Sequence, residues 1–505
     1  MTPREAAGTR PRDVRPVAVS RICELVGVES APGEVIGLSL ASTAVRPGDL
    51  YAALAGARTH GARFAGQAVE AGAVAILTDR EGAAIIGAAD IPVLVVDNPR
   101  AQLGDIAALV YDRPAGSMVT LGVTGTQGKT TVTRLAESAL VAADKTPAVV
   151  GTIGTRIAGH DVRTVLTTPE APALHALLAA MREQGVSACA MEVSSHALVQ
   201  GRVDGIVFDV AVFLNLGRDH LDYHGTVEEY FAAKAMLFTP EHARHAVINV
   251  ADEHGRRLAA ATTLPVTTFS TEGPADWTAR TVDARPTGTR AVFAGPDGLD
   301  VAVDVPLPGS FNVTNALAVV AALAAGGVDP VVAGGGIGTS TGVPGRMQPV
   351  DTGEGFQVVV DYAHKPDALE AVLSTLRPVT RGRLIVVIGA GGDRDTGKRP
   401  VMGEIAARLA DVVVVTDDNP RTEDPADIRR AVLDGTDTDG ADVREVGDRA
   451  AAIGAAVELA GDGDCVLIAG KGHEQGQEIA GKVHPFDDVT QAQAALRVRK
   501  EARTR

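Results

Sequence analysis

The sequence predicts an α/β protein of three domains, in which the central and C-terminal domains each fold around a mainly parallel sheet. Three observations lead to this fold class. The chain has 505 residues, which is too long for one typical domain. Short apolar runs alternate with helical patterns, as in doubly wound sheets with helices on both faces. A glycine-rich turn joins one apolar run to a helix in the middle of the chain.

The pattern divides the chain into four segments. The first sixteen residues are charged and contain proline without an apolar core, which indicates a disordered tail and no signal peptide. The loops around residues 111–116 and 341–346 mark the other boundaries. The expected segments are the tail at 1–16, an N-terminal domain at 17–114, a central domain at 115–343 and a C-terminal domain at 344–505.

Composition excludes several classes of protein. Lys and Arg number 47 against 63 Asp and Glu, and the resulting charge of −16 argues against a general nucleic-acid or membrane-surface binder. No apolar run approaches the roughly 20 residues that span a bilayer. Cys23, Cys189 and Cys465 are far apart and are expected to be buried thiols in a reducing compartment. We expect a cytoplasmic monomer that binds small molecules, without nucleic acid or membrane as partner.

The stretch from Val119 to Leu135, VTLGVTGTQGKTTVTRL, predicts a phosphate-binding loop. Its glycines let backbone N–H groups close on phosphate oxygens at a helix N-terminus. Lys129 can reach the outer phosphates, and the Thr130 hydroxyl can ligate Mg²⁺. Five residues separate Gly122 from Gly128, one more than in the usual spacing. A glycine turn capping an ordinary helix is the alternative, but strand, Gly-Lys-Thr and helix together favour the phosphate loop.

Two acidic features follow strands of the same predicted sheet. Glu192 ends the run ACAMEV, and Asp219 and His220 follow the run VFLNL. Ligands of such sheets bind outside the carboxyl ends of the strands, where a carboxylate beside a phosphate loop suits Mg²⁺. Taken singly, each residue would be a solvated loop residue. Their association with the loop favours a metal site.

Lys234 lies at an unusual position for a lysine. Thr226 and Glu229 form a capping-box pattern, which predicts a helix over about 227–238. Lys234 falls among the apolar positions of that helix. From the pattern alone, a lysine whose head reaches water is as plausible as one that faces the nucleotide site. The expected apolar stripe comprises Val227, Tyr230, Phe231 and Phe238.

Isolated polar residues elsewhere carry weaker signals. Ser42 and Thr59 can bind a ligand, although turn or capping roles are favoured for isolated hydroxyls. Asn312 either caps the long apolar helix that follows it or faces the ligand, and Asn315 lies one turn further on.

Polar loops also follow the strands of the C-terminal domain. Arg394, the segment 418–421 and Glu474 suit a zwitterionic ligand, because arginine pairs with carboxylate and glutamate with ammonium. A set of surface ion pairs explains them equally well. The glycine run at 389–392 is similar to a dinucleotide fingerprint, but Arg394 occupies the third glycine position, so we reject NAD binding.

In their order, the motifs resemble those of the Mur ligase family, and within it the members that add diaminopimelate. The segments are GTQGKTT, EVSSHALVQGR, NLGRDHLDYHG, the AAK at Lys234, GSFNVTNALA, GVPGRM, DYAHKPDAL, GGDRDTGKRP and DNPRTEDP. The resemblance implies a UDP-binding N-terminal domain, a central P-loop ATPase and a C-terminal Rossmann-like domain that binds the amino acid. It further implies an ATP-dependent ligase of peptidoglycan precursor synthesis, which joins diaminopimelate to UDP-MurNAc-L-Ala-D-Glu through an acyl phosphate.

The resemblance also implies residue roles. The implied catalytic residues are Lys129, Lys234, His220 and Glu192. The implied ATP-binding residues are Gly125, Thr126, Gln127, Gly128, Lys129, Thr130, Thr131, Asn312, Arg346, Asp361 and His364. The implied residues of the UDP-MurNAc-dipeptide site are Leu40, Ser42, Ala57, Arg58, Thr59, Thr167, Thr168, Ser194, Gln200 and Arg202. The implied diaminopimelate-binding residues are Arg394, Asp418, Asn419, Pro420, Arg421, Gly470 and Glu474. The implied Mg²⁺ ligands are Thr130, Glu192, His220 and Lys234, the lysine as a CO₂-derived carbamate (N6-carboxylysine).

The segment Asp418–Arg421, DNPR, resembles the diaminopimelate form of the third-domain motif. L-Lysine lacks the far carboxylate and would leave a buried arginine unpaired, which can discriminate by about 10⁴-fold. The alternatives are a related ligase that adds L-lysine, a folylpolyglutamate synthase-like ligase, and a nucleotide-binding switch without turnover. The sequence leaves the stereoisomer of diaminopimelate open.

Overall fold

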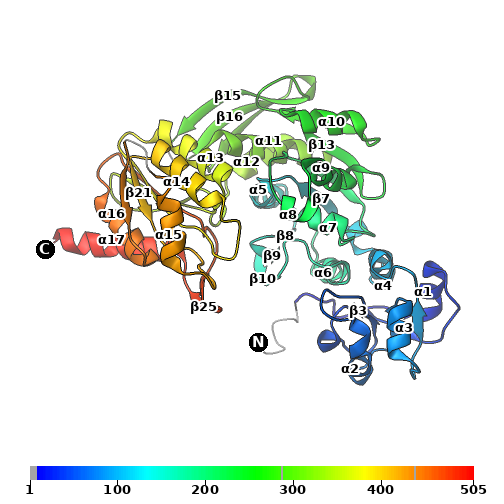
Figure 1. Cartoon of the computed structure of the whole chain (residues 1–505). Coiled ribbons are helices and arrows are strands. Elements are labelled where there is room, and N and C mark those ends of the chain that lie inside the picture. Colours follow the sequence, from blue (N-terminus) through cyan, green and yellow to red (C-terminus); the bar gives the residue numbers. More distant parts are fainter. Residues whose placement is uncertain (1–7, 286–287, 437–439, 505) are drawn as a thin grey trace. The chain divides into compact units, whose positions relative to one another are not determined.

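The computed structural model describes residues 8–285, 288–436 and 440–504 (Figure 1). The chain divides into two compact units, one comprising Met1–Ala279, Phe293–Val301 and Asn315–Gly336, the other comprising Arg280–Val292, Ala302–Thr314 and Ile337–Arg505. Each unit contains helices and a mainly parallel sheet, which confirms the predicted fold class. The three domain boundaries expected from the sequence stay a prediction.

The N-terminal part of the first unit is built on a small parallel sheet. Its strand order is β3-β4-β5-β6, with a separate two-stranded ladder of β1 and β2. The strands are β1 Val17–Ala18, β2 Glu34–Val35, β3 Gly37–Ser39, β4 Asp49–Ala52, β5 Ala75–Thr78 and β6 Val93–Val95. The helices are α1 Val19–Val26, α2 Ala65–Glu70, α3 Arg80–Ile86 and α4 Leu103–Val110.

Part of the expected disordered tail is held against this sheet. Arg10 donates two hydrogen bonds to the Asp49 carboxylate, at 2.6 and 3.0 Å, and the backbone N–H of Arg12 donates to Glu183. The expectation of a loose tail is therefore corrected at these positions, because Asp49 is buried and needs a cationic partner. The first seven residues of the predicted tail lie outside the described residues.

The central sheet has the order β10-β9-β8-β11-β7-β12-β13-β14-β15-β16-β17. Strands β8, β11, β7, β12, β13 and β14 are parallel, and the β9–β10 hairpin adds antiparallel strands at one edge. The strands are β7 Val119–Thr124, β8 Pro147–Gly151, β9 Gly154–Ile157, β10 His160–Val162, β11 Ala188–Glu192, β12 Phe208–Phe213, β13 Ala243–Asn249, β14 Val266–Ser270, β15 Trp277–Arg285, β16 Gly288–Ala294 and β17 Asp300–Val305.

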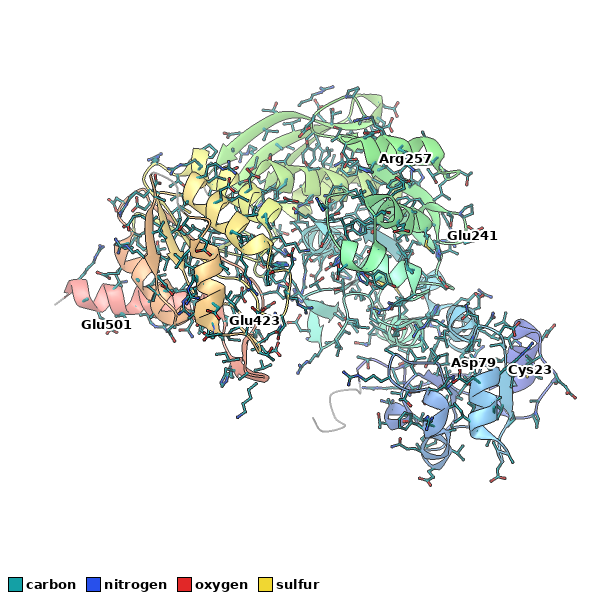
Figure 2. All side chains as sticks on the ribbon, viewed as in Figure 1. Cys23, Asp79, Glu241, Arg257, Glu423 and Glu501 are labelled. Atoms are coloured by element: carbon teal, nitrogen blue, oxygen red, sulfur yellow. The ribbon has the colours of Figure 1, made fainter. Side chains whose placement is uncertain are left out.

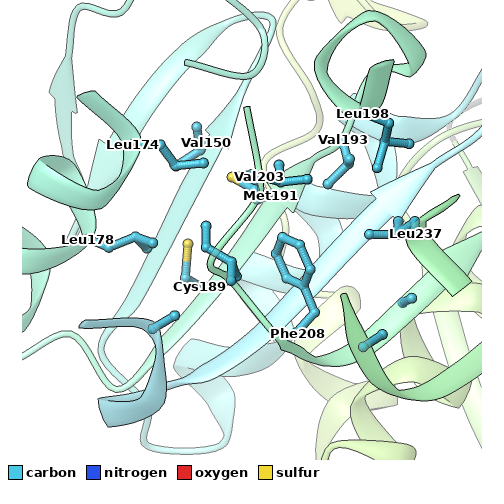
Figure 3. Packing of buried hydrophobic residues seen from close by; sticks show 14 of the residues in the cluster. Val150, Leu174, Leu178, Cys189, Met191, Val193, Leu198, Val203, Phe208 and Leu237 are labelled. Atoms are coloured by element: carbon cyan, nitrogen blue, oxygen red, sulfur yellow. The ribbon is translucent and has the colours of Figure 1, made fainter. Parts of the chain in front are cut away.

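Helices cover both faces of the central sheet. Leu174 and Leu178 of α6 pack with Val150, Met191 and Phe208 of the strands (Figure 3). Helix α5 packs against the same strands, β8 and β11, but contributes no residue to this cluster, which puts it on the other face. The helices are α5 Lys129–Ala142, α6 Ala171–Glu183, α7 Ser195–Val199, α8 Leu221–His224, α9 Val227–Ala235, α10 Glu253–Ala261, α11 Ser310–Ala325 and α12 Pro330–Ile337.

The C-terminal sheet has the order β18-β19-β23-β20-β21-β22, and only β18 is antiparallel to its neighbour among these strands. The strands are β18 Gln348–Val350, β19 Gln357–Asp361, β20 Leu384–Ile388, β21 Val412–Val415, β22 Asp442–Glu445 and β23 Cys465–Ala469, with a hairpin of β24 Gly476–Ile479 and β25 Lys482–Pro485. The helices are α13 Pro366–Leu376, α14 Lys398–Leu409, α15 Pro425–Leu433, α16 Arg449–Leu459 and α17 Asp488–Thr504.

The three cysteines are free and buried, as predicted, and Cys23 is labelled in Figure 2. Burial raises the pKa of the Cys189 and Cys465 thiols to about 12, so both stay protonated and act as small apolar side chains. Within the described residues, no helix combines the length and the apolar character needed to cross a membrane.

Buried His175 on α6 should make the stability of the first unit depend on pH. Burial lowers the pKa of His175 from 6.5 to about 4, against a contact of Nε2 with the Asp204 carbonyl at 3.0 Å. The unfolded chain therefore takes up a proton below pH 6.5 while the folded chain does not. We expect stability to fall between pH 6.5 and 4, by up to about 1.4 kcal/mol per pH unit.

Denaturant unfolding measured across this pH range tests the expectation. The His175→Gln variant should lose this part of the pH dependence, whereas His160→Gln, at an exposed position of β10, should keep it. Parallel pH profiles for His175→Gln and the unmodified protein would show that the histidine does not contribute.

Candidate nucleotide and substrate site

The phosphate loop joins the carboxyl end of β7 to α5. Strand β7 ends at Thr124 and α5 begins at Lys129, which confirms the predicted strand, glycine turn and helix. Gly128 has a φ of +89°, and a Cβ there would lie 2.5 Å from Asn315 Oδ1. Only glycine fits this turn, because any side chain would strain the backbone and collide with Asn315. The side chains of Thr130 and Thr131, at the start of α5, are buried.

Asn215, which follows β12, holds the phosphate loop in shape. Its Oδ1 accepts hydrogen bonds from the backbone N–H groups of Thr126 and Gln127, at 3.1 and 3.0 Å, and its Nδ2 donates to the Gln127 carbonyl at 3.2 Å. We did not predict this residue as part of the site. The available signal was its place after a strand beside β7, at the same edge of the sheet.

Two lysines meet at the carbonyl oxygen of Gly125. Lys129 Nζ donates to this oxygen at 2.7 Å, and Lys234 Nζ donates to it at 2.9 Å. Lys234 is 1% exposed, and its Nζ lies 4.5 Å from the centre of the Tyr230 ring. The lysine therefore faces inward, and the alternative of a head group in water is excluded.

Burial and the charge of Lys129 together hold the pKa of Lys234 well below its ordinary value, and Asp219 only partly opposes them. A lowered pKa increases the fraction of the amine that is neutral at a given pH, and a neutral amine is nucleophilic. Lys234 thus combines a fixed position beside the phosphate loop with a lowered pKa.

The helix that carries Lys234 begins at the predicted cap. Thr226 Oγ1 accepts from the Glu229 N–H, and Glu229 Oε2 accepts from the Thr226 N–H, each at 3.1 Å. Helix α9 continues into a 3₁₀ turn at Met236–Phe238, close to the predicted end. The predicted stripe is wrong at Val227, which is 37% exposed because it lies in the first turn of the helix.

Glu192 lies at the end of β11 inside a cluster of hydroxyl groups. Its carboxylate accepts hydrogen bonds from the backbone N–H and the hydroxyl of Thr152, at 2.9 and 3.0 Å, and is 1% exposed. The Thr152 hydroxyl also contacts Thr167 at 3.1 Å. Thr168 Oγ1 donates to the Glu192 carbonyl at 2.8 Å and lies 3.5 Å from Ser194 Oγ. Thr152, which we did not predict, links Glu192 to these candidate substrate residues.

Arg202 and Gln200 extend this cluster. Arg202 donates to Gln200 Oε1 at 2.6 Å and to the Thr168 carbonyl at 3.1 Å, and it pairs with Glu170 at 3.2 Å. Gln200 Nε2 donates to the Tyr223 hydroxyl at 3.3 Å. The five candidate dipeptide residues of the central domain, Thr167, Thr168, Ser194, Gln200 and Arg202, thus belong to one connected polar network.

His220 lies in a group of aromatic rings next to this network. It has a φ of +53°, which is uncommon for a residue with a side chain, and its Nε2 lies 3.4 Å from Asp219 Oδ2. The His196 ring lies 4.9 Å from the His220 ring and 4.1 Å from Tyr223, measured between centres. Among the described residues, His, Cys, Asp and Glu form no group of three or more that could hold a metal ion.

The candidate UDP contacts in the N-terminal part are less closely connected. Ser42 Oγ donates to Gln67 Oε1 at 2.8 Å, so its hydroxyl has a structural partner. The loop of Ala57, Arg58 and Thr59 is exposed and is closed by a hydrogen bond from the Gly56 N–H to the Thr59 carbonyl at 3.1 Å. Leu40 packs at the edge of the N-terminal core.

In the second unit, Arg346 and His364 lie close to the ring of Tyr362, and Asp361 precedes Tyr362 in the chain. The Arg346 guanidinium lies 4.7 Å from the Tyr362 ring centre, and the His364 ring lies 4.5 Å from it. The Asp361 carboxylate accepts from the Met347 and Ala363 N–H groups at 2.7 and 2.8 Å. Burial lowers the pKa of His364 to about 4, which keeps this imidazole neutral at neutral pH. The fourth candidate, Asn312, is buried in α11 and donates to the Pro308 carbonyl at 2.8 Å.

The candidate diaminopimelate residues follow the carboxyl ends of three strands: Arg394 follows β20, and the others follow β21 and β23. Lys471, which we did not predict, is fully buried and donates to Asn419 Oδ1 at 2.8 Å and to Asp418 and Glu474, each at 3.4 Å. Asn419 Nδ2 donates to Glu474 Oε2 at 2.9 Å. Gly470 has a φ of +118°, and a Cβ there would lie 2.6 Å from Asp418 Oδ2.

Arg394 and Arg421, the two arginines of this group, differ in exposure and in their partners. Arg394 is exposed. Arg421 Nη1 donates to the Gly392 carbonyl at 2.7 Å, and Arg421 Nε donates to Glu478 Oε2 at 3.2 Å, with Pro420 buried beside it. Arg421 is thus paired without a ligand, which corrects the expectation that L-lysine would leave this arginine unpaired. Sequence reasoning missed Glu478, which lies on the β24–β25 hairpin.

A phosphate loop at the carboxyl end of β7 and a second, mainly parallel sheet are typical of an α/β nucleotide-binding protein. Three family models match successive segments: the Mur ligase family catalytic domain at 34–111, the Mur ligase middle domain at 123–323 and the Mur ligase glutamate ligase domain at 345–472. The chain belongs to the Mur ligase family.

Relatives match nearly the whole chain. A protein of Streptomyces coelicolor named UDP-N-acetylmuramoyl-L-alanyl-D-glutamate--2,6-diaminopimelate ligase is 51% identical over 493 residues, covering 95% of this chain and 97% of that protein. A protein of Corynebacterium efficiens with the same name is 47% identical over 515 residues, covering 98% of each. A solved structure titled with this ligase name has a TM-score of 0.71 and 35% identity, covering 96% of this chain and all of that one.

The hydrogen bonds of Asn215 predict a specific effect on nucleotide binding. Asn215→Ala removes the acceptor that orders two amides of the phosphate loop, so we expect the KM for ATP to rise about tenfold, as for a loss of 1.4 kcal/mol. Steady-state kinetics with varied ATP measure this change. Asn98→Ala, which breaks a similar side-chain bond to the Ala101 N–H in the N-terminal part, is the matched control. Equal KM values for the two variants would refute the assignment.

Proposed function

We propose that the chain is an ATP-dependent amide-bond-forming ligase that adds 2,6-diaminopimelate to the γ-carboxylate of D-Glu in UDP-MurNAc-L-Ala-D-Glu. The reaction is a step of peptidoglycan precursor synthesis. The observation that carries this proposal is the 51% identity, over 95% of the chain, to a relative named for this reaction. The phosphate loop with two converging lysines supplies chemistry that fits the reaction.

The reaction needs activation because a carboxylate does not react with an amine until one of its oxygens becomes a good leaving group. In the proposed route, the γ-phosphoryl group of ATP passes to the carboxylate, forming a phosphorus–oxygen bond as the bond to ADP breaks. The amine then attacks the acyl carbon and loses a proton, and phosphate departs. Lys129, beside the loop glycines, is suited to offset the charge that develops on the phosphoryl oxygens.

We infer that Thr130, Glu192, His220 and Lys234 would hold Mg²⁺, which when bound would offset phosphate charge. The hydroxyl and carboxylate oxygens suit this ion. Lys234 suits it only after modification, because an ammonium repels a cation. Reaction of its neutral amine with CO₂ forms a nitrogen–carbon bond, releases a proton and gives N6-carboxylysine, an anion. The burial of Lys234 and the lowered pKa of its amine support this modification.

The polar network around Glu192 supports a site for the muramoyl dipeptide. Arg202 offers a charged donor for a substrate carboxylate, and the hydroxyls of Thr167, Thr168 and Ser194 suit peptide or sugar oxygens. We assign the UDP group to the N-terminal residues, where the exposed loop of Ala57, Arg58 and Thr59 leaves polar groups accessible.

The C-terminal group has the charges that diaminopimelate requires. Arg421 and Arg394 suit its carboxylates, and Glu474 with Asp418 suits an ammonium group. Asn419 and Gly470 complete the group through the contacts with Glu474 and Asp418 described above. L-Lysine-adding, folylpolyglutamate synthase-like and switch functions share the phosphate loop, but no observation favours them over the diaminopimelate ligase.

The proposal predicts that phosphate release requires three substrates together. We expect release from ATP only when UDP-MurNAc-L-Ala-D-Glu and diaminopimelate are both present, with a product whose mass is that of the amide. Assays with meso-diaminopimelate, LL-diaminopimelate and L-lysine identify the amino acid. Release without the dipeptide, or equal turnover with L-lysine, would contradict the proposal.

In the same assay, the Lys129→Ala variant should lose phosphate release, because the phosphate loop loses the cation that we propose to offset phosphoryl charge. Lys145→Ala, at an exposed position just after α5, should remain active. Circular dichroism of both variants shows whether the fold is retained.

A further inference from the structure

The carboxylate of Glu478 forms an ion pair with Arg421, the arginine that we assign to the amino-acid substrate. Glu478 Oε2 accepts from Arg421 Nε at 3.2 Å, and the two side chains are 39% and 22% exposed. The Gly392 carbonyl accepts from Nη1 of the same guanidinium at 2.7 Å. Arg421 itself has a φ of +53°, so its side chain leaves the loop from a fixed, left-handed backbone position.

The backbone holds Glu478 in this place. The Arg421 N–H donates to the Glu478 carbonyl at 3.0 Å, and the Ala480 N–H donates to the Arg421 carbonyl at 2.7 Å, so β24 pairs with the loop of residues 418–421. The Glu478 N–H also donates to Asn419 Oδ1 at 3.0 Å. The backbone of Glu478 is therefore fixed beside the loop of residues 418–421, which keeps its carboxylate within reach of Arg421.

We propose that Glu478 is a specificity-determining residue that competes with the far carboxylate of the amino-acid substrate for Arg421. The inference rests on the proposed function, because it concerns the same amino-acid site. A ligand carboxylate must share or displace an existing ion pair, which weakens its binding. A ligand without that carboxylate leaves Arg421 paired with Glu478, so the penalty for an unpaired arginine is reduced. Glu478 thus lowers both the affinity for diaminopimelate and the discrimination against L-lysine.

The size of the effect follows from the exposure of the pair. Partly exposed ion pairs contribute little because water screens them, and breaking one corresponds to roughly a two- to fivefold change in an equilibrium constant. We therefore expect Glu478→Gln, which keeps the hairpin and the side-chain volume, to lower the KM for diaminopimelate about threefold. The KM values for ATP and the dipeptide should not change. The ratio of kcat/KM for diaminopimelate to that for L-lysine should increase.

Two further variants make the test specific. Glu370→Gln removes a similar exposed ion pair, between Glu370 and Arg408 at 2.8 Å on α13 and α14, and should leave the KM for diaminopimelate unchanged. In an Arg421→Ala background, Glu478→Gln should have no effect on this KM, because the competing pair no longer exists.

The outcomes separate the inference from the proposed function. A KM for diaminopimelate that rises in Glu478→Gln would show that the carboxylate orients Arg421, and an unchanged KM would show that the pair is only structural; either result overturns the inference. The same Glu478 effect in the Arg421→Ala background would also overturn it. If the unmodified enzyme shows no turnover that depends on diaminopimelate, the proposed function itself fails.

Discussion

The carbonyl oxygen of Gly125 is the point on which the candidate nucleotide site depends. It accepts hydrogen bonds from Lys129, the lysine of the phosphate loop, and from Lys234, which comes from a helix 109 residues away in the sequence. Two amines that share one acceptor in a buried place cannot both keep a full charge at low cost. The pKa of the buried Lys234 falls. This constraint connects the fold of the phosphate loop to the chemical reactivity of Lys234.

The second unit also contains a buried lysine, but this one has charged partners. Lys471 is fully buried, but it keeps carboxylates and an amide within reach at Asp418, Asn419 and Glu474. Such partners stabilise a buried cation, whereas the described close contacts of Lys234 are a backbone carbonyl and an aromatic ring. Lys471 thus holds together the polar group that we propose for the amino acid, and Lys234 supplies the amine that we propose for modification.

The sequence predicted the features that local patterns determine. The strand, glycine turn and helix of the phosphate loop, and the cap formed by Thr226 and Glu229, depend on residues close in the chain. It could not show that Asn215 orders the loop from 88 residues away, or that Glu478 pairs with Arg421 across 57 residues, because these contacts arise from strand order and hairpin docking. The orientation of Lys234 was open for the same reason: periodicity placed it among apolar residues but did not identify its partner.

The reactivity of Lys234 is the central claim, and NMR with ¹³C-labelled bicarbonate tests it most directly. The protein equilibrated with the label at neutral pH should show one carbamate carbonyl resonance that disappears in the Lys234→Arg variant, since a guanidinium stays protonated. Lys145→Arg, at an exposed lysine, should retain the resonance. An active ligase without this resonance, or a resonance that persists in Lys234→Arg, would contradict the account.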